Sequence, residues 1–421
     1  MAAYGALVSL MHIIDTLEKH PSPPISIDTK QVQSITQIVT SLQEFLDSYT
    51  SPLADSHEAD PLERRIADAV YAAEDVIESH IVDQIQSGST VVEDHDFYQN
   101  LQKVIEEMNL INQEVMKSIE VEAQIKQKPV AASTSSSPTV KENVIVGSEE
   151  VFLEVLDKLT GYKLDRQIIP ITGMGGIVDE LGSTGNVKYC KIHDLLRDLC
   201  LKEAEKERFY HVISDVPPAS ISERRVVLKT GGLVGSVSRA RSIICDYDKG
   251  AREDGEVLLS RDLRLLRTFN ACVSKRYAYF LENVFEMVNL RYLAIGIHDE
   301  FRFSSSIDLL WNLHTLIIYS IYRHKLVVPN EIWKLHQLRH LEFRVLGLIL
   351  PDPSGSDIVV MENLHTLKGV QDWNLNEEVV KRIPNTRKLH LTEAVVVSAK
   401  EIVEIHEDLY GERLDLRVDD N

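Results

Sequence analysis

Apolar residues recur three and four positions apart over the first 125 residues, a pattern that predicts four amphipathic helices. The second set has the a/d spacing of a heptad repeat. Asp60 as N-cap, Pro61 at the first helical position and Glu63 mark the start of the third helix. Helices with short connections predict an antiparallel four-helix bundle. The four apolar sets are Leu7, Leu10, Met11, Ile14 and Leu17; Val32, Ile35, Val39, Leu42 and Leu46; Leu62, Ile66, Ala69, Ala73, Val76 and Ile77; and Phe97, Leu101, Val104, Met108, Ile111 and Val115.

The hydrophobic pattern lapses at residues 126–143, where Ser, Thr, Ala and Pro dominate. Too little apolar surface is present to offset the entropy of ordering, so a flexible linker is predicted. Beyond it, residues 148–159 have a helical pattern and residues 167–172 that of a buried strand. Another helix is expected to start at Asp194, which suits an N-cap.

A five-residue unit recurs through the C-terminal half, with spacings of 24, 23, 25, 26 and 22 residues. These spacings match the period of leucine-rich repeats, whose strands bury their leucines only by stacking on neighbours. The alternative is chance leucine spacing in a helical protein. Residues 243–246 (IICD) are expected to form a first repeat strand, the alternative being a magnesium-binding acidic strand. The units are 265–269 (LLRTF), 289–293 (NLRYL), 312–316 (NLHTL), 337–341 (QLRHL), 363–367 (NLHTL) and 385–389 (NTRKL).

Composition narrows the function classes. The 421 residues predict about three domains, and 44% apolar residues can build sizeable cores. The 45 basic and 65 acidic residues give a net charge of −20, and no run of Lys or Arg is present, which argues against a nucleic-acid partner. No apolar stretch approaches the length of a transmembrane helix, and no signal peptide is evident. The four cysteines (Cys190, Cys200, Cys245 and Cys272) are expected to be buried or idle thiols, the alternatives being a disulfide or a zinc site.

Gly173, Gly175 and Gly176 follow the predicted strand and look like the opening of a phosphate-binding loop. A working loop then needs a glycine, a lysine and a hydroxyl residue, but Val178, Asp179 and Glu180 occupy these places. The two carboxylates would repel a phosphate. The sequence therefore predicts a broken phosphate loop.

The third helix carries Glu74, Asp75 and Glu78 beside its apolar stripe. On physical grounds alone, a solvated helix face is the simpler interpretation. No paired catalytic carboxylates, nucleophile–base arrangement or metal-spaced His/Cys group stands out. We therefore expect no catalytic residue and no metal site.

The order of these motifs resembles that of plant intracellular immune receptors with coiled-coil, nucleotide-binding and leucine-rich-repeat domains, and in particular the late blight resistance proteins of nightshades. Residues 72–78 (AAEDVIE) are similar to the acidic motif of their third helix. Residues 169–177 (IPITGMGGI) look like the entry to their nucleotide-binding domain, and residues 187–199 (VKYCKIHDLLRDL) like their Met-His-Asp motif, with Ile192 in place of Met.

The resemblance implies an α+β multidomain chain. Its parts would be a coiled-coil four-helix bundle (1–125), a linker (126–143), a truncated nucleotide-binding and winged-helix remnant (144–215) and a leucine-rich-repeat solenoid (216–421). In the family, ADP holds the receptor closed, and exchange for ATP with magnesium lets the bundles associate and trigger defence and local cell death.

The resemblance also implies roles for single residues. Gly173, Gly175 and Gly176 would belong to the phosphate loop, and His193 would contact the nucleotide. Glu74, Asp75 and Glu78 would contact basic residues of the repeats within the same chain. The expected partners are a pathogen effector or a guarded host protein, together with self-association through the bundle.

The chain departs from the family in lacking the phosphate-loop Lys and Thr, the magnesium-binding strand and the intervening subdomains. We therefore expect that it binds no ADP or ATP and catalyses no reaction. It would act as a cytoplasmic recognition and signalling scaffold that could associate peripherally with a membrane. The alternatives are a working ADP/ATP switch ATPase and an inert product of a decayed resistance gene.

Overall fold

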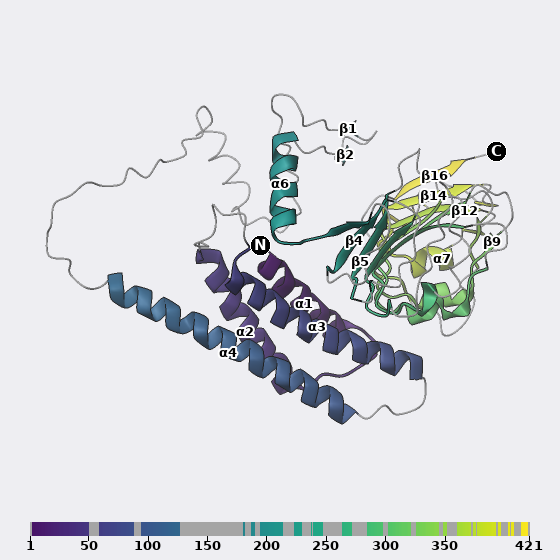
Figure 1. Cartoon of the computed structure of the whole chain (residues 1–421). Helices are drawn as coiled ribbons and strands as arrows, with labels where there is room; N and C mark the ends of the chain where they lie inside the picture. Colours follow the sequence, from purple (N-terminus) through teal and green to yellow (C-terminus); the bar gives the residue numbers. More distant parts are fainter. Residues whose placement is uncertain are drawn as a thin grey trace. The chain divides into compact units, whose positions relative to one another are not determined.

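A computed structural model gives the fold of the chain, which divides into two compact units (Figure 1). One unit comprises Met1–Val115 and Glu205–Asn421, and the other Met116–Ala204. The described residues are 2–49, 59–87, 94–126, 180–181, 187–189, 194–213, 223–229, 237, 239–246, 263–271, 284–297, 302–320, 326–344, 348–351, 360–371, 374–375, 377–392, 395–396, 403–404, 406–407 and 414–419.

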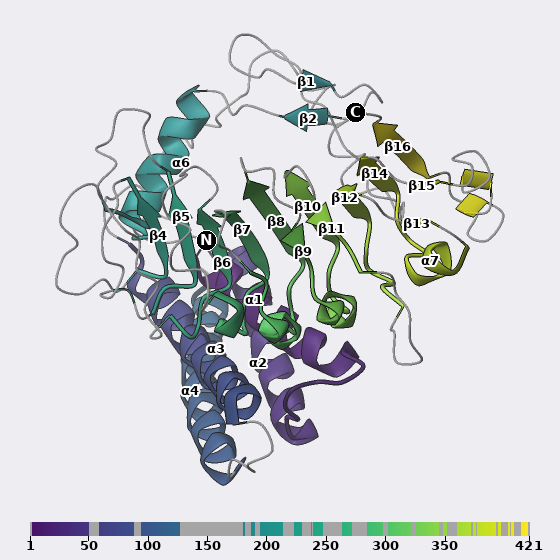
Figure 2. The ribbon, with the colours of Figure 1, turned by 90° about the vertical axis from the view of Figure 1, so that its right-hand side faces the viewer.

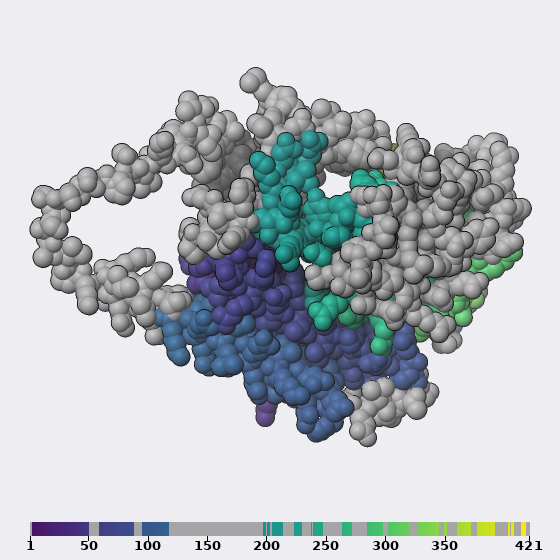
Figure 3. Space-filling view, viewed as in Figure 1, coloured from purple at the N-terminus to yellow at the C-terminus, as the bar shows by residue number. Residues whose placement is uncertain are grey.

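Four N-terminal helices form where the apolar pattern predicts them: α1 (Ala2–Lys19), α2 (Thr29–Ser48), α3 (Pro61–Ser87) and α4 (Asp94–Lys126). Their apolar stripes share one core, in which the predicted positions are buried or, for Met11, Val32, Leu46, Leu62, Val76 and Val104, partly buried. Part of the surface of α4 is visible in the space-filling view (Figure 3). Leu110, on this helix, is exposed to solvent.

Capping explains where α3 begins. Asp60 Oδ1 accepts hydrogen bonds from the backbone N–H groups of Leu62 (2.8 Å) and Glu63 (3.2 Å), which would otherwise lack partners in the first turn. The predicted N-cap and proline start are therefore confirmed. Similarly, α1 ends at Lys19, before the proline-rich segment.

The C-terminal half forms a sheet of parallel strands, seen side by side in Figure 2. Along its main path the strands follow chain order, as expected when each repeat pairs with the next. Strands β9 (Leu326–Val327) and β11 (Leu348–Ile349) join beside this path. The main strands are β3 (His211–Ile213), β4 (Arg225–Leu228), β5 (Ser242–Cys245), β6 (Thr268–Ala271), β7 (Tyr292–Ile297), β8 (Thr315–Ser320), β10 (His340–Arg344), β12 (Thr366–Gln371), β14 (Lys388–Thr392) and β16 (Asp415–Asp419).

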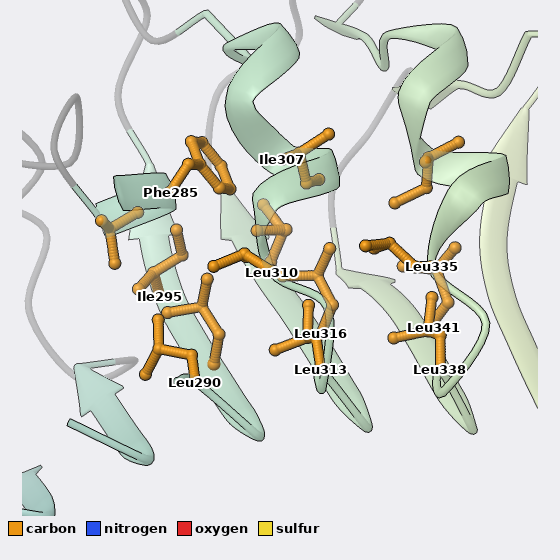
Figure 4. Close-up of a cluster of buried hydrophobic side chains, with 14 of the residues drawn as sticks. Phe285, Leu290, Ile295, Ile307, Leu310, Leu313, Leu316, Leu335, Leu338 and Leu341 are labelled. Atoms are coloured by element: carbon orange, nitrogen blue, oxygen red, sulfur yellow. The ribbon is translucent and has the colours of Figure 1, made fainter. Parts of the chain in front are cut away.

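Each of the six five-residue units leads into one of these strands, and its leucines enter a continuous core (Figure 4). Leu313, Leu316 and Ile318, for example, are fully buried. The asparagine that opens several units bonds to the neighbouring repeat: Asn363 Nδ2 donates to His336 O at 2.8 Å. The leucine-rich repeat prediction is therefore confirmed, and the chain is of the α+β class.

The sheet begins earlier than the sequence indicates. Strands β3 and β4 precede β5, so residues 243–245 are not in the first strand, and β3 lies before residue 216. Both early strands are short and lack the LxxL signature, but the backbone of β4 pairs in register with β5, and that of β3 with β4. Ile243 is a core residue of this sheet, so the alternative of a magnesium-binding strand is wrong.

The second unit contains the antiparallel pair β1 (Glu180–Leu181) and β2 (Val187–Tyr189), and most of α6 (Asp194–Lys206), which starts where a helix is predicted. Of the predicted linker at 126–143, Lys126 is the last residue of α4, and residues 127–143 lie outside the described residues. The predicted helix at 148–159, the predicted strand at 167–172 and the glycine turn also lie outside them. The short elements β13 (Asn374–Leu375), β15 (Val395–Val396), η2 (Ser305–Leu309), η3 (Asn330–Lys334) and α7 (Glu377–Arg382) belong to the repeats.

Within the first unit, the core of the N-terminal helices continues into the repeats. Val288 and Trp311, which precede β7 and β8, are buried in the same hydrophobic cluster as the helices. His20, at the end of α1, packs edge-on against Trp311 with a ring distance of 5.6 Å. Helices and repeats are therefore joined by apolar contacts as well as by the polar site described next.

Candidate functional site

The acidic residues of α3 face the repeats. Glu74 and Glu78 lie one helical turn apart, with Asp75 beside them. Glu74 is only 1% exposed and Glu78 only 2%. The interpretation of these acids as a solvated helix face is therefore wrong. A carboxylate is buried in this way only when positive charge compensates for its lost hydration.

The compensating charge comes from a basic ladder, which we define as the residue immediately before each of eight strands: Arg224, Arg241, Arg267, Arg291, His314, Arg339, His365 and Arg387. Each ladder residue after the first donates its backbone N–H to the carbonyl oxygen of the one before it, at 2.6–2.9 Å. Successive ladder residues are thus about one strand spacing apart, roughly 4.8 Å, close to the rise of about 5.4 Å for one helical turn. One turn of α3 can therefore span adjacent repeats.

Asp75 pairs with the first two arginines of the ladder. Arg224 binds it in a bidentate manner, with both nitrogen–oxygen distances at 2.8 Å. The Arg224 guanidinium also lies over the ring of Tyr71, at 4.2 Å from the centroid. Arg241 binds the same carboxylate through NH2. Asp75 is thus held by two guanidinium groups from adjacent repeats.

Glu74 and Glu78 share Arg267. Its Nε donates to Glu78 Oε1 at 2.7 Å, and NH2 lies 3.0 Å from Glu74 Oε2. Its NH1 also donates to Ser9 Oγ of α1 at 2.8 Å. Glu78 lies 3.3 Å from Arg241 Nε. The Arg267 guanidinium therefore connects both α1 and α3 to the start of β6.

Burial and neighbouring charges set the pKa values of the arginines. Burial lowers the pKa of Arg267, but the attraction of Glu78 and Glu74 outweighs this and raises it above its ordinary value. Burial and the repulsion of Arg267 lower the pKa of Arg291 to about 10. Arg291 approaches Glu78 only to 4.0 Å. The cluster therefore holds four cations against three carboxylates, and Arg291 is the least compensated of the four.

Further contacts extend the interface along α3. Asn289 Nδ2 donates to the backbone carbonyl of Glu78 at 3.2 Å, and Arg264 pairs with Asp83 near the end of the helix. On α1, the ring of His12 lies 6.0 Å from that of His314, the next member of the ladder. The N-terminal helices thus contact the first five positions of the basic ladder.

The arrangement is suited to holding two parts of the chain together and has no feature of a reaction centre. Guanidinium groups stay charged and cannot act as bases at neutral pH. In the described part of the chain, no three His, Cys, Asp or Glu side chains are grouped to hold a metal ion. Of the cysteines, Cys200 is exposed and Cys245 is buried, while Cys190 and Cys272 lie outside the described residues.

The structure brings together Glu74, Asp75 and Glu78 of the predicted site residues, whereas Gly173, Gly175, Gly176 and His193 lie outside the described residues. The sequence analysis did not identify the arginines opposite the acids. A signal was present, because the third residue of all six five-residue units is Arg or His. Arg224 and Arg241 precede the first of these units, in segments without the leucine pattern, so the sequence did not mark them. No described helix is both long and apolar enough to cross a membrane.

Comparisons with known proteins point to one group. The chain is 27% identical over 241 residues to the late blight resistance protein homologue R1B-12 of Solanum demissum (51% of this chain, 17% of that protein). It is 27% identical to late blight resistance protein R1-A of the same species (49% and 18%), and 26% identical to the ToMV susceptible protein tm-2 of Solanum lycopersicum (49% and 26%). The matches thus span about a quarter or less of these relatives.

No family model matches the chain. Among solved structures, it is similar to a leucine-rich-repeat protein of Leptospira interrogans, with a TM-score of 0.32, 18% identity, and coverage of 47% of this chain and 49% of that one. A second similar structure is internalin C2 of Listeria monocytogenes, with a TM-score of 0.31, 12% identity, and coverage of 46% and 78%. By its sequence matches, the chain is a homologue of plant disease resistance proteins.

Proposed function

We propose that this chain is a plant immune receptor, or a truncated isoform of one, that acts as a scaffold in which the repeats hold the N-terminal helices in a resting state. The helices act as an antiparallel four-helix bundle, and their release allows self-association and defence signalling, including local cell death. The buried cluster of three carboxylates and four arginines supports this proposal, because it joins two parts far apart in sequence.

The charged character of the cluster makes it a suitable restraint. Removing one partner of a buried ion pair leaves an uncompensated charge, at a cost of about 3–5 kcal/mol. A partner that binds either surface can therefore shift the equilibrium between docked and released helices. A contact made only of apolar side chains would be less sensitive to a charged competitor.

Charge reversal tests the restraint. In the full chain, Glu78→Lys places a cation against Arg267 and Arg241, so we expect the helices to separate from the repeats. The radius of gyration from solution scattering should increase while the helical circular dichroism signal is retained. When expressed in leaves, this variant should trigger cell death without an elicitor.

The matched control is Asp68→Lys, which makes the same charge change at an exposed position of α3. It should leave both readouts unchanged, and Glu78→Lys combined with Arg267→Glu should restore the compact, silent state. An unchanged radius of gyration for Glu78→Lys, or an equal change for Asp68→Lys, would contradict the proposal.

We further propose that the chain has lost the ADP/ATP switch of its relatives, because Val178, Asp179 and Glu180 stand where the loop needs Gly, Lys and a hydroxyl residue. Titration of the folded chain with labelled ADP and ATP, with and without magnesium, should show no saturable binding. Micromolar or tighter binding would restore the alternative of a working nucleotide switch. An unfolded product would favour the alternative of a decayed gene.

The partner recognised by the repeats is proposed to be a pathogen effector or a guarded host protein, encountered in the cytoplasm. No role for His193 is needed in this scheme. The Gly173, Gly175 and Gly176 turn would then be a relic of the nucleotide-binding domain, between a winged-helix remnant and the bundle.

A further inference from the structure

The basic ladder continues beyond the part that α3 covers. Arg339, His365 and Arg387 follow His314, and the same backbone hydrogen bonds of 2.8–2.9 Å connect them. The helices of the first unit supply their carboxylates to the first four positions and a histidine ring to the fifth. The three later positions have no carboxylate of α3 opposite them.

Strand residues next to these positions add further positive charge. His340, Lys368 and Lys388 lie on β10, β12 and β14, at or near the starts of the strands. We call Arg339, His340, His365, Lys368, Arg387 and Lys388 the basic strip. Four of its members are exposed, and His365 and Lys368 are half-buried.

The members of the strip lie close enough to influence one another. The rings of His340 and His365 are 6.5 Å apart. Burial, and then the positive charges of His365, Arg339 and Lys368, lower the pKa of His340. These four members therefore form one electrostatic surface over two repeats, and Arg387 and Lys388 lie on the next repeat.

Two nearby acids pair with arginines outside the strip. Glu342 pairs with Arg344 at 2.8 Å, and Asp415 pairs with Arg417 at 3.4 Å. Among the described residues, no carboxylate lies within ion-pair distance of Arg339, Lys368 or Lys388. A chain with a net charge of −20 thus concentrates positive charge on one surface, which favours an anionic partner.

The contact with α3 indicates which kind of anion fits. There, carboxylates one helical turn apart bind arginines on adjacent repeats. The strip crosses β10, β12 and β14, about 10 Å at the usual strand spacing, which a single carboxylate cannot span. We propose that the basic strip is a docking surface for an acidic helix of a partner protein, with carboxylates spaced one turn apart.

This inference rests on the proposed function only in assigning partner recognition to the repeats. The test uses the full chain and a fluorescent alanine-based helical peptide with glutamates four residues apart, titrated by anisotropy. The peptide should bind saturably, and its affinity should fall as salt rises. A peptide of the same length with glutamine in place of glutamate should bind at least tenfold more weakly.

Two double variants with equal charge changes separate the strip from general electrostatics. Lys368→Gln with Lys388→Gln should weaken binding of the acidic peptide at least tenfold. Lys334→Gln with Lys381→Gln removes exposed lysines of η3 and α7 that pair with Asp308 and Glu377, and should change affinity less than twofold. Thermal unfolding would verify that both variants remain folded.

Equal losses in the two double variants, or equal binding of the glutamine peptide, would overturn the proposal. Competition by inorganic tripolyphosphate at the affinity of the peptide would also overturn it, since the strip would then be a site for small anions. Lys368→Gln with Lys388→Gln lies outside the contact with α3 and should leave the radius of gyration unchanged, so failure of the α3 restraint and failure of the strip are distinguishable.

Discussion

At the residue scale, the arginines at one position of successive repeats differ in how much negative charge compensates their own. Arg267 contacts two buried carboxylates and a serine hydroxyl, whereas Arg291 reaches one carboxylate only at 4.0 Å. The difference arises from the α3 residue that lies opposite each arginine. A ladder position therefore acquires its role from the partner it meets.

Truncation of these two arginines should separate the roles. Arg267→Ala leaves Glu74 and Glu78 buried with less compensation and should destabilise the first unit by about 3–5 kcal/mol. Arg291→Ala removes the least compensated cation, and its destabilisation should be smaller by at least about half. Thermal and denaturant unfolding would measure both, and equal losses would contradict the assignment.

Gly369 is a second residue whose role is local. It lies in β12 with a φ of +76°, where the pairing register with β14 shifts. A Cβ atom built there would lie 1.8 Å from the carbonyl oxygen of Phe343 on β10. Only glycine fits this backbone position and conformation.

Gly369→Ala should therefore destabilise the repeats by about 2–4 kcal/mol, combining the left-handed strain with the steric clash. The matched control is Gly5→Ala in α1, where nothing lies within 4 Å of the added Cβ atom. That variant should stabilise the helix by about 0.5–1 kcal/mol. Differential scanning calorimetry on both variants would check the opposite signs.

At the scale of elements, α3 is the segment on which the interface depends, and its first turn is fixed by Asp60. Besides capping the helix, the Asp60 carboxylate accepts a hydrogen bond from Tyr49 Oη at 2.9 Å. This bond connects the end of α2 to the start of α3. The start of α3, and therefore the axial position of its acids, depends on a buried capping residue.

Asp60→Ala should lower the stability of the first unit by about 1–2 kcal/mol, through loss of the cap and of the tyrosine bond. Asp60→Asn keeps an accepting oxygen at the N-cap and should retain most of that stability. Unfolding monitored at 222 nm would compare them. Similar losses for both variants would indicate that the charge of Asp60, rather than its capping bonds, is what stabilises the helix.

At the scale of the whole molecule, the contact of α1 with the repeats is rich in histidine. His12 faces His314, with Arg291 and Arg339 nearby, and His20 lies 5.7 Å from His336. Burial is the largest of the causes that lower the pKa values of these four histidines. For His314, burial, Arg339, Arg291 and His12 together lower the pKa to about 4.

The folded state therefore binds fewer protons than the unfolded state once the pH falls below about 6.5, the ordinary histidine pKa. The stability contributed by neutral His314 is complete above this pH, falls as the pH decreases towards 4, and is lost below it. After allowance for solvent screening, the effect of this histidine should be about 1–2 kcal/mol. Melting curves between pH 7.5 and 4.5 would measure this loss of stability. His314→Gln should make the melting temperature less dependent on pH, and an unchanged pH dependence in this variant would contradict the prediction.

Much of this fold follows from local pattern. The helices, the start of α3 at Asp60 and the six repeat units have periodicities that depend only on which residues must be buried. The same helical periodicity placed Glu74, Asp75 and Glu78 beside the apolar stripe of α3, but it did not indicate that they are buried. The sequence analysis missed strands β3 and β4 because they are short and are recognised only through backbone pairing, β4 with β5 and β3 with β4.

The basic ladder is not a run of Lys or Arg along the chain, and the sequence alone shows only that the third residue of each five-residue unit is Arg or His. Its members are 17 to 26 residues apart in sequence, and the parallel stacking of repeats brings their backbones into a single hydrogen-bonded row. Local periodicity determines which segments are helices and repeats, because burial depends on near neighbours in sequence. Pairing of α3 with the first arginines, and exposure of the later ones, depends on which surfaces meet, and only tertiary packing decides that.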